Sequence, residues 1–482
     1  MRLKKPKPYA PPPGSLLVGV GEQRFIEKPD RIWLTPKLAG SHALVVGRTG
    51  SGKTKWLENV CRQYLAGEHP FTLLDLHGDL AVGLRDYAAE IGRELIWLDA
   101  ANPDRTVTFN PLAAEPGHEA TQILELVASF RRHWSDSWGP RLADLLTHSL
   151  SVLAANQLTL CELPLLLGSA DVRMRLLEKA PPAAKDYFAY RYGPLSKRDQ
   201  IMVSESTANK VGALLSDSRV RTFIGDPQPT LRPHQVMAKG ETLIARIPRG
   251  ALVENADLLA SLLLAAFHTA ALARVSLSPA KRRPYALVID EAQIASETFP
   301  QLLSGARAFG LSAICGIQYL DQVPPNLTEA LLANTRVRVV FGVARRDAER
   351  LAKEMYAVDG DHVKFMETDL FGARKSKPIY WSINEEWEYL NRFLMDQATG
   401  ECVIQLGREL PWFANAIEIE PARPAPNQLA ALARICRRRA RDRAGLEAAI
   451  RARRQSLYDD AFNDTTQKGG DPYDDDTIYE TA

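Results

Sequence analysis

Eight consecutive residues, Gly47 to Thr54, have the composition and spacing of a loop that binds phosphate groups. They read Gly-Arg-Thr-Gly-Ser-Gly-Lys-Thr, with four free positions between the first glycine and the final Gly-Lys-Thr. Glycines let the backbone wrap closely around an anion, because they carry no Cβ atom. Lys53 can reach the β- and γ-phosphates of a nucleotide, and the Thr54 hydroxyl can ligate Mg²⁺. The stretch therefore predicts a site for ATP and Mg²⁺ made by Gly47, Arg48, Thr49, Gly50, Ser51, Gly52, Lys53 and Thr54.

The residues on either side of this loop predict the elements that a phosphate site requires. Residues 43–46 form a short apolar run that is typical of a buried strand, and residues 55–65 place Trp56, Leu57 and Val60 on one face of a helix. A helix N-terminus offers unpaired N–H groups and the positive end of its dipole to an anion. Strand, glycine loop and helix follow in the required order, which argues against a chance match in a glycine-rich turn.

A second pair of candidate residues, Asp290 and Glu291, follows the apolar run 286–289. Such a run predicts a strand that is buried on both faces and brings its carboxylates to the sheet edge where the glycine loop also lies. Asp290 would hold Mg²⁺, directly or through water. Glu291 would orient the attacking water and accept its proton, so the pair predicts ATP hydrolysis. The alternative is a solvated turn that carries two acids.

Short apolar runs alternate with longer helical patterns, which indicates an α/β fold with a mostly parallel sheet covered on both faces. The predicted strands are residues 43–46, 72–75, 95–98, 242–247, 286–290, 313–317 and 337–341. Between residues 110 and 235 Leu- and Ala-rich helical spacing predicts an all-α inserted subdomain. The expected divisions are a basic, Pro-rich arm at 1–30, a nucleotide-binding domain at 31–112 and 236–422, the all-α insertion at 113–235, and a basic helix with an acidic, disordered tail at 423–482.

Composition places few limits on function. The formal net charge is +2, so a polyanion partner would need a local basic patch. The five cysteines are scattered without metal-ligand spacing, and no apolar signal segment is evident at the N-terminus, so we expect a cytoplasmic protein. The stretch 258–273 is apolar but shorter than the roughly 20 residues that cross a bilayer, which favours a helix buried against the sheet.

Several short motifs in a fixed order give the chain a resemblance, over roughly residues 30–420, to the FtsK/HerA-like P-loop motor ATPases. Within that family it resembles the conjugative coupling proteins of type IV secretion, of the TraD/TraG type. One departure is Leu76, which stands where the family usually has proline. Besides the glycine loop and Asp290-Glu291, the motifs are His42, Asp75-Leu76-His77-Gly78-Asp79, Phe109-Asn110-Pro111-Leu112, Gly305-Ala306-Arg307-Ala308-Phe309-Gly310, Gly316-Ile317-Gln318, Asn334-Thr335 and Arg345-Arg346-Asp347-Ala348.

The resemblance implies a RecA-like P-loop NTPase fold and roles for four further residues. Arg307 lies at the position of an arginine finger, which would stabilise charge on the γ-phosphate bound by a neighbouring subunit. A salt-bridged helix residue is the alternative for Arg307. Gln318 lies where the family carries a polar γ-phosphate sensor, although a capping amide would look the same. Asp75 and His77, at the end of a predicted strand, would either line the nucleotide site or only terminate the strand, and we favour the site.

The function that the resemblance implies is an ATP-driven DNA translocase, a homo-hexameric ring that pumps DNA, with or without a bound relaxase. Its partners would be DNA, further copies of the chain, the relaxosome and type IV secretion components. The family's coupling proteins usually carry N-terminal transmembrane helices and none is evident here, so we expect contact with the inner face of the membrane through partners only. The alternatives are a HerA-like helicase or translocase in DNA end processing or packaging, and a nucleotide-gated adaptor that docks a substrate with little hydrolysis.

Two basic stretches are candidate DNA contacts. In the helical insertion, Trp134 and Trp138 lie close in sequence to Arg131, Arg132 and Arg141, and this group could stack on DNA. The alternative is that the tryptophans are core and cap residues and the arginines are solvated, and we favour this alternative. Further along, arginines crowd an Ala-rich helical stretch that could bind phosphates as an arm, and the acidic tail that follows could shield it. The arginines of this arm are Arg434, Arg437, Arg438, Arg439, Arg441, Arg443, Arg451, Arg453 and Arg454.

Overall fold

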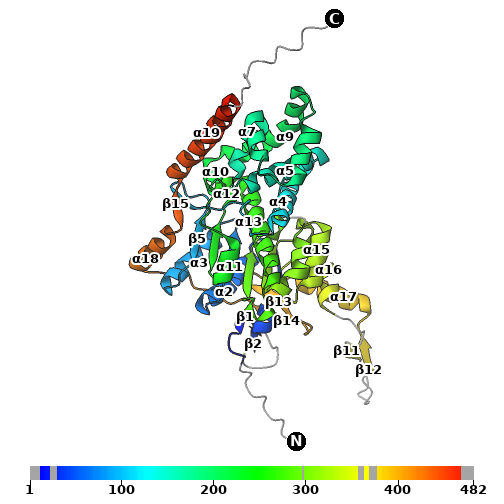
Figure 1. The fold of residues 1–482 in the computed structure, drawn as a ribbon. Coiled ribbons are helices and arrows are strands. Elements are labelled where there is room, and N and C mark those ends of the chain that lie inside the picture. Colours follow the sequence, from blue (N-terminus) through cyan, green and yellow to red (C-terminus); the bar gives the residue numbers. More distant parts are fainter. Residues whose placement is uncertain (1–10, 22–29, 296–297, 357–362, 368–376, 468–482) are drawn as a thin grey trace.

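The structure is a computed structural model that describes residues 11–21, 30–295, 298–356, 363–367 and 377–467. Its centre is an eleven-stranded sheet with the strand order β2-β1-β14-β13-β10-β3-β9-β8-β4-β7-β5 (Figure 1). In that order the strands are β2 (Asp30–Leu34), β1 (Leu16–Gly21), β14 (Trp412–Asn415), β13 (Glu401–Leu406), β10 (Val337–Val340), β3 (Ala43–Val46), β9 (Leu311–Ile317), β8 (Tyr285–Ile289), β4 (Phe71–Asp75), β7 (Leu243–Arg246) and β5 (Ile96–Asp99).

The seven strands from β10 to β5 are parallel, and they are the seven that the apolar runs predict. Alternate residues of these strands face opposite sides of the sheet, and both sides are buried, which explains why the runs are continuously apolar. Four antiparallel strands, β13, β14, β1 and β2, extend the sheet beyond β10. The sequence patterns did not predict these four strands. β14, for example, has four residues of which one is buried, so its apolar signal is weak.

Helices cover both faces of the sheet. On one face lie α2 (Lys53–Ala66) and α3 (Asp79–Glu90). On the other face lie α13 (Asn255–Leu272), α14 (Phe299–Gly305), α15 (Pro325–Asn334) and α16 (Arg345–Met355). The remaining elements outside the helical part of the chain are α1 (Pro36–Ala39), α11 (Pro233–Lys239), α12 (Arg249–Leu252), α17 (Ile383–Met395) and a hairpin of β11 (Val363–Glu367) and β12 (Lys377–Tyr380).

Helix α13 is apolar on all sides, and every residue from Leu258 to Ala271 is buried. Among the described residues it is the one helix that is long and apolar enough to cross a membrane, yet 83% of its most apolar window lies inside the protein. It packs between the sheet and the helix α4 (Glu119–His133), which confirms the expected helix buried against the sheet.

Between β6 (Arg105–Val107) and α11 the described chain is helical, and this part, residues 119–224, is called the helical region below (Figure 1). Its apolar residues form one continuous core with α13 and with one face of the sheet. Its helices are α4, α5 (Pro140–Ala155), α6 (Leu163–Gly168), α7 (Ala170–Leu177), α8 (Pro182–Asp186), α9 (Lys197–Ser216) and α10 (Ser218–Ile224).

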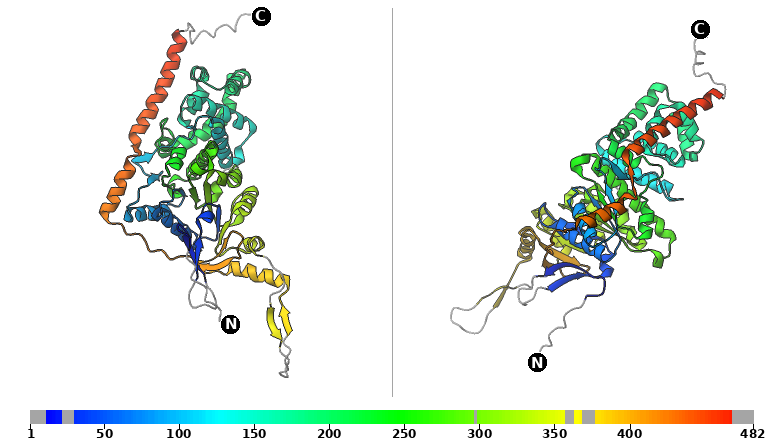
Figure 2. Two further views of the ribbon diagram at one scale, coloured as in Figure 1. Left: turned by 60° about the horizontal axis from the view of Figure 1, so that its bottom comes forward. Right: turned by 90° about the vertical axis from the view of Figure 1, so that its left-hand side faces the viewer.

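The C-terminal strap, residues 426–467, runs from the sheet to the helical region along the outside of the molecule (Figure 2). Its first helix, α18 (Pro426–Arg437), packs on α3, and its strand β15 (Ala440–Asp442) pairs with β6. Its last helix, α19 (Arg443–Gln467), packs on α7 and α10. The strap therefore ties the sheet domain to the helical region. The acidic residues 468–482 lie outside the described residues.

Candidate nucleotide-binding and catalytic site

The glycine loop joins the end of β3 to the start of α2, as the sequence predicts. A Cβ atom at Gly47 would lie 2.5 Å from the Cβ of Phe341 and 2.7 Å from the Ser51 hydroxyl, so no larger residue fits there. Gly52 caps α2 with φ 115°, a conformation that residues with a side chain rarely adopt. The loop is thus held in a closed turn that directs the first N–H groups of α2 at a common point.

Lys53 is buried in the first turn of α2 and folds back over this loop. Its Nζ donates to the carbonyl oxygens of Gly47 at 2.6 Å and of Arg48 at 3.3 Å. Burial lowers the pKa of Lys53, while the negative charges of Asp290 and Glu291 act in the opposite direction. The ammonium group is therefore held on the glycine loop, where a phosphate chain would need a positive charge.

Asp290 and Glu291 follow β8 and are each only 4% exposed. Burial raises the pKa of Asp290 to about 6, and Asp75 adds to the rise, whereas Lys53 and His77 oppose it. A bound cation would stabilise the ionised form of this buried carboxylate, because the cation offsets the cost of burying its charge. The structure thus brings the second predicted pair to the same sheet edge as the glycine loop.

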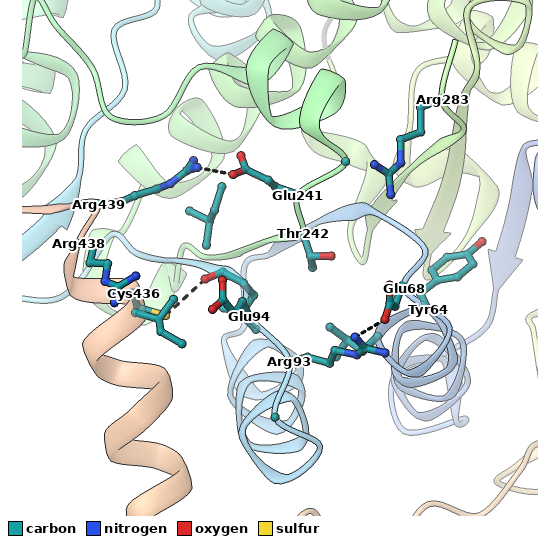
Figure 3. Close-up of a pocket in the computed structure, with 16 residues that line it drawn as sticks. Tyr64, Glu68, Arg93, Glu94, Glu241, Thr242, Arg283, Cys436, Arg438 and Arg439 are labelled. Carbon is teal, nitrogen blue, oxygen red and sulfur yellow. Dashed lines mark hydrogen bonds and ion pairs between the residues drawn. The ribbon is translucent and has the colours of Figure 1, made fainter. Parts of the chain in front are cut away.

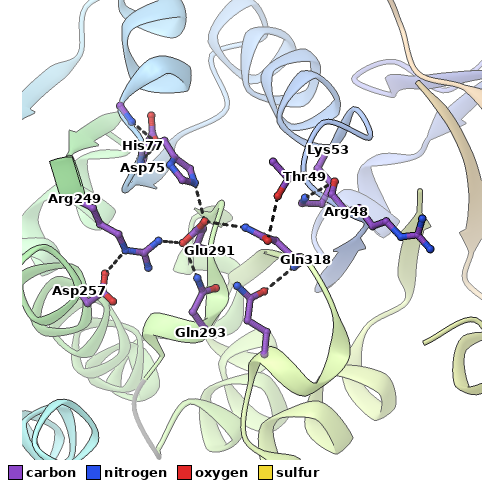
Figure 4. Close-up of polar contacts among 12 residues, drawn as sticks. Arg48, Thr49, Lys53, Asp75, His77, Arg249, Asp257, Glu291, Gln293 and Gln318 are labelled. Carbon is purple, nitrogen blue, oxygen red and sulfur yellow. Dashed lines mark hydrogen bonds and ion pairs between the residues drawn. The ribbon is translucent and has the colours of Figure 1, made fainter. Parts of the chain in front are cut away.

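Glu291 lies at the centre of a ring of donors (Figure 4). Its Oε1 lies 2.7 Å from Nε2 of His77 and accepts from Nε2 of Gln318 at 3.5 Å. Its Oε2 accepts from Nη1 of Arg249 and from Nε2 of Gln293, the latter at 2.6 Å. Burial acts to raise the pKa of Glu291, but the hydrogen bonds and charges of Arg249 and His77 outweigh it and hold the pKa below its ordinary value.

Gln318 follows β9, and its side chain connects the glycine loop to Glu291. Its side-chain oxygen accepts from the Thr49 hydroxyl at 3.2 Å, and its side-chain nitrogen donates to Glu291 at 3.5 Å. A side chain that contacts both the glycine loop and the carboxylate of Glu291 is placed to respond to a terminal phosphate. This geometry favours the sensor interpretation of Gln318 over that of a capping amide.

For Asp75 the structure favours the alternative to a direct nucleotide contact. Its carboxylate is fully buried at the end of β4, and it accepts three backbone N–H groups at the start of α3. These come from His77 at 2.9 Å, Gly78 at 2.9 Å and Ala81 at 2.8 Å. Both oxygens are therefore used in shaping the turn, and that turn places the ring of His77 against Glu291.

Three further residues bear on the sequence-based interpretation. Arg48 directs its guanidinium away from Lys53 and donates to the carbonyl oxygen of Val343 at 2.5 Å (Figure 4). Arg48 therefore contributes its backbone, and not its side chain, to the glycine loop. His42 lies at the other end of β3, where its Nδ1 accepts from the N–H of Ala313 at 3.0 Å. Arg307 is in the short 3₁₀ turn Ala306–Phe309, and its side chain lies outside the part of the chain that the structure describes.

Solved structures share this arrangement of sheet and helices, although no protein-family model matches the sequence and a search of curated proteins finds no match. The conjugative coupling protein TrwB, in its unbound form, aligns with a TM-score of 0.56 and 16% identity over 82% of this chain and 88% of its own. The TrwB complex with ADP and Mg²⁺ aligns with a TM-score of 0.55 and 15% identity over 82% and 89%. VirB4 of Thermoanaerobacter pseudethanolicus aligns at 0.51 and 13% over 87% and 100%. The chain has the TrwB fold.

The TrwB fold confirms the RecA-like P-loop fold class that the motifs predict. It also gives the predicted residues a common frame, because the glycine loop, Asp290, Glu291 and Gln318 all follow parallel strands at one sheet edge. Ligands of open parallel sheets bind at that edge.

Arg249 and Gln293 complete the site but were not among the predicted site residues. Arg249 follows β7, which pairs with β4, and β4 pairs with β8. The signal was therefore in the sequence, since Arg249 comes just after a predicted strand. What the sequence lacks is the strand order, which alone brings the end of β7 close to Glu291.

The aromatic-basic group of the helical region is built into the protein. Trp134 stacks on the ring of Phe130 with centroids 4.7 Å apart, and the guanidinium of Arg131 lies 6.0 Å from the ring centre of Trp138. Arg132 donates to the carbonyl oxygen of Gln293 at 3.1 Å. The core and cap account of these residues is favoured over a stack on DNA.

Four arginines of the predicted DNA-binding arm form ion pairs or hydrogen bonds within the protein. For these four, the structure corrects the expectation of a free basic arm. Arg453 pairs with Glu162 and Arg441 with Asp226 at 2.8 and 3.2 Å, while Arg439 pairs with Glu241. Arg443 is buried and donates to carbonyl oxygens of Asn102 and Ala100, among others, and burial lowers its pKa to about 10. These side chains fasten the strap.

A cavity of about 500 Å³ lies where β5 and β7 begin, at the sheet edge opposite the glycine loop (Figure 3). Its wall includes α18 of the strap, and two of its arginines pair with acids: Arg93 with Glu68 at 2.5 Å, and Arg439 with Glu241. Because these arginines are paired with acids, we interpret the cavity as a polar seam between the strap and the sheet, and not as the nucleotide site.

Proposed function

We propose that this protein is an ATP-driven DNA translocase of the coupling-protein kind. The observation that carries the proposal is the convergence of the glycine loop, Asp290, Glu291 and Gln318 at one sheet edge. The likeness to TrwB supports it, since that protein is a conjugative coupling protein and has been solved with ADP and Mg²⁺.

The residues of the site fit a magnesium nucleotide. The closed turn at Gly47 leaves no room for a side chain, and the ammonium group of Lys53 is held on the same loop. Thr54 and Asp290 would hold Mg²⁺, whose charge would lower the repulsion between the phosphates and the incoming water.

In the proposed reaction each group of the chain has one task. The loop N–H groups and Lys53 bind the β- and γ-phosphates of ATP. Glu291 accepts the proton of the water that attacks the γ-phosphorus, and ADP leaves. Gln318, in contact with Thr49 and Glu291, would report whether the γ-phosphate is present. Arg307 would act across an interface between copies, which requires a ring, and we propose a homo-hexamer.

DNA would be the substrate that the ring moves, and the relaxosome and type IV secretion components would be its further partners. We place such a ring in the cytoplasm at the inner face of the membrane, held there through those partners. A HerA-like helicase or translocase is the alternative, and it would use the same site residues; the described residues contain nothing that favours it over a coupling protein.

The test is ATP hydrolysis by the full chain with Mg²⁺, measured without DNA and with single- or double-stranded DNA. We expect a low basal rate that DNA raises, and no turnover by the Lys53→Ala variant. If the unaltered chain binds no nucleotide, the proposal fails.

One observation favours a second candidate, a nucleotide-gated adaptor with little hydrolysis. Both oxygens of Glu291 are held by donors of the chain itself, which leaves the carboxylate poorly placed to accept a proton from water. Tight nucleotide binding without DNA-stimulated turnover would support the adaptor over the motor.

A further inference from the structure

The contact between Arg249 and Glu291 is the start of a connected path that ends in the helical region. Arg249 begins the short helix α12, directly after β7, and its backbone N–H donates to the carbonyl oxygen of Leu76 at 2.9 Å. Its guanidinium divides between two acids: Nη1 donates to Glu291, and Nε donates to Asp257 on α13 at 2.6 Å. Arg249 therefore bridges the catalytic carboxylate and a helix that packs against the helical region.

Helix α12 is itself held from the helical region. Nη2 of Arg219, on α10, donates to the carbonyl oxygen of Ala251 at 2.9 Å. Arg219 is fixed in turn by Asp217, at 2.7 Å, and its own carbonyl oxygen accepts from Arg443 of the strap at 2.5 Å. A continuous series of contacts thus runs from the strap and α10, through α12, to Glu291.

The turn that follows α12 is strained. Val253 has φ 50° and ψ −127°, although it is β-branched and 69% exposed. A β-branched residue with positive φ costs on the order of 1–3 kcal/mol, and such strain persists only where surrounding contacts hold it. The contact from Arg219 to Ala251 lies two residues before it. A cavity of about 380 Å³ lies between this turn and helices α9 and α10, so the turn has open space on the side of the helical region.

We propose that Arg249 is a positioning residue that restrains Glu291, and that Arg219 controls this restraint by holding α12. When Arg219 holds α12, Arg249 occupies the carboxylate of Glu291 and the basal rate of hydrolysis is low. A substrate bound at the helical region would weaken the Arg219–Ala251 contact, so that α12 and Arg249 shift and Glu291 becomes available to the attacking water. This inference rests on the proposed role of Glu291 in ATP hydrolysis.

The first experiment measures ATP turnover of Arg249→Met without DNA. We expect kcat to rise about fivefold or more, the size of a typical coupling between sites, with KM and nucleotide affinity unchanged. DNA stimulation should shrink because the basal rate has risen. Arg249→Lys, which keeps a positive charge near Glu291, should stay closer to the unaltered chain. The double variant Arg249→Met, Glu291→Gln should lose the gain, which shows that Arg249 acts through Glu291.

Arg246→Met is the matched control for this variant. Arg246 lies three residues earlier, at the end of β7, and pairs with Asp99 at 3.1 Å instead of Glu291. Its loss should leave the basal kcat unchanged. A kcat of Arg249→Met that equals the unaltered value, or that falls towards that of Glu291→Gln, overturns the inference. An unaltered chain that hydrolyses no ATP overturns the proposed function instead.

The second experiment tests the path from the helical region. Arg219→Met should also raise the basal kcat, and amide hydrogen exchange of residues 249–255 should become faster even without nucleotide. Arg221→Met is its control, because Arg221 lies on the same helix but pairs with Glu447 of the strap at 2.7 Å. Equal exchange of residues 249–255 in Arg219→Met and in the unaltered chain would remove Arg219 from the proposal.

Discussion

Arg453 of the C-terminal strap pairs at 2.8 Å with Glu162, whose side chain is fully buried in the helical region. Glu162 also accepts from the N–H of Thr159 at 2.9 Å, so its charge is enclosed by groups of the protein. The strap that looks in sequence like a free basic arm is therefore partly a structural element.

We predict that Arg453→Met destabilises the protein by about 3 kcal/mol, because it leaves the charge of Glu162 buried without its cation. Urea unfolding measures the change. Arg451→Met is the control, since Arg451 is exposed on the same helix, and it should change the free energy of unfolding by less than about 0.5 kcal/mol. Equal stability of the two variants would mean that the strap is not held by this pair.

Lys53→Ala and Glu291→Gln should separate binding from chemistry. Lys53→Ala removes the positive charge over the loop, so nucleotide affinity should fall while the fold survives. Glu291→Gln keeps the shape of the side chain but cannot accept a proton, so ATP should stay bound and intact. Equilibrium binding of a fluorescent ATP analogue and turnover of ATP measure the two effects. Loss of affinity in Glu291→Gln would give that residue a structural role.

Asp290→Asn should stabilise the protein while it removes magnesium-dependent binding. The pKa of Asp290 is raised from 3.8 to about 6, so ionisation of this carboxyl costs folding free energy. The cost is absent below about pH 4, grows between pH 4 and 6 and is complete above pH 6, where it amounts to roughly 2–3 kcal/mol. Thermal unfolding without nucleotide should show the gain at pH 7.5 and none near pH 4. The exposed Asp186→Asn should show none at either pH.

Arg307 can be tested by mixing subunits. If it acts across an interface, Arg307→Ala and Lys53→Ala subunits, each inactive alone, should together form some competent interfaces and regain partial ATP turnover. The first supplies an intact nucleotide site and the second an intact arginine. Mixed rings without any recovery would show that Arg307 acts, if at all, within its own subunit.

How far the sequence predicts this structure depends on the range of each signal. The glycine loop and Asp290-Glu291 are local patterns, and the seven parallel strands are apolar because both faces are buried, so all were predicted. Arg249 reaches Glu291 only through the strand order, which no local pattern contains. The arginines of the strap were read as a free surface because composition does not show which charges have partners. Arg443, for instance, is buried against backbone carbonyl groups.

The turn after α12 offers a direct test of stored strain. Val253→Gly should raise the free energy of unfolding by roughly 1 kcal/mol, because relief of a strain of about 1–3 kcal/mol exceeds the entropy cost of glycine, about 0.5–1 kcal/mol. Little burial is lost, since Val253 is 69% exposed. Val253→Ala is the matched control: it keeps a Cβ atom, and so the strain, and should be no more stable than the unaltered chain. Urea unfolding of the three proteins gives the comparison, and equal stability of the Gly and Ala variants would show that the positive φ of Val253 stores no energy.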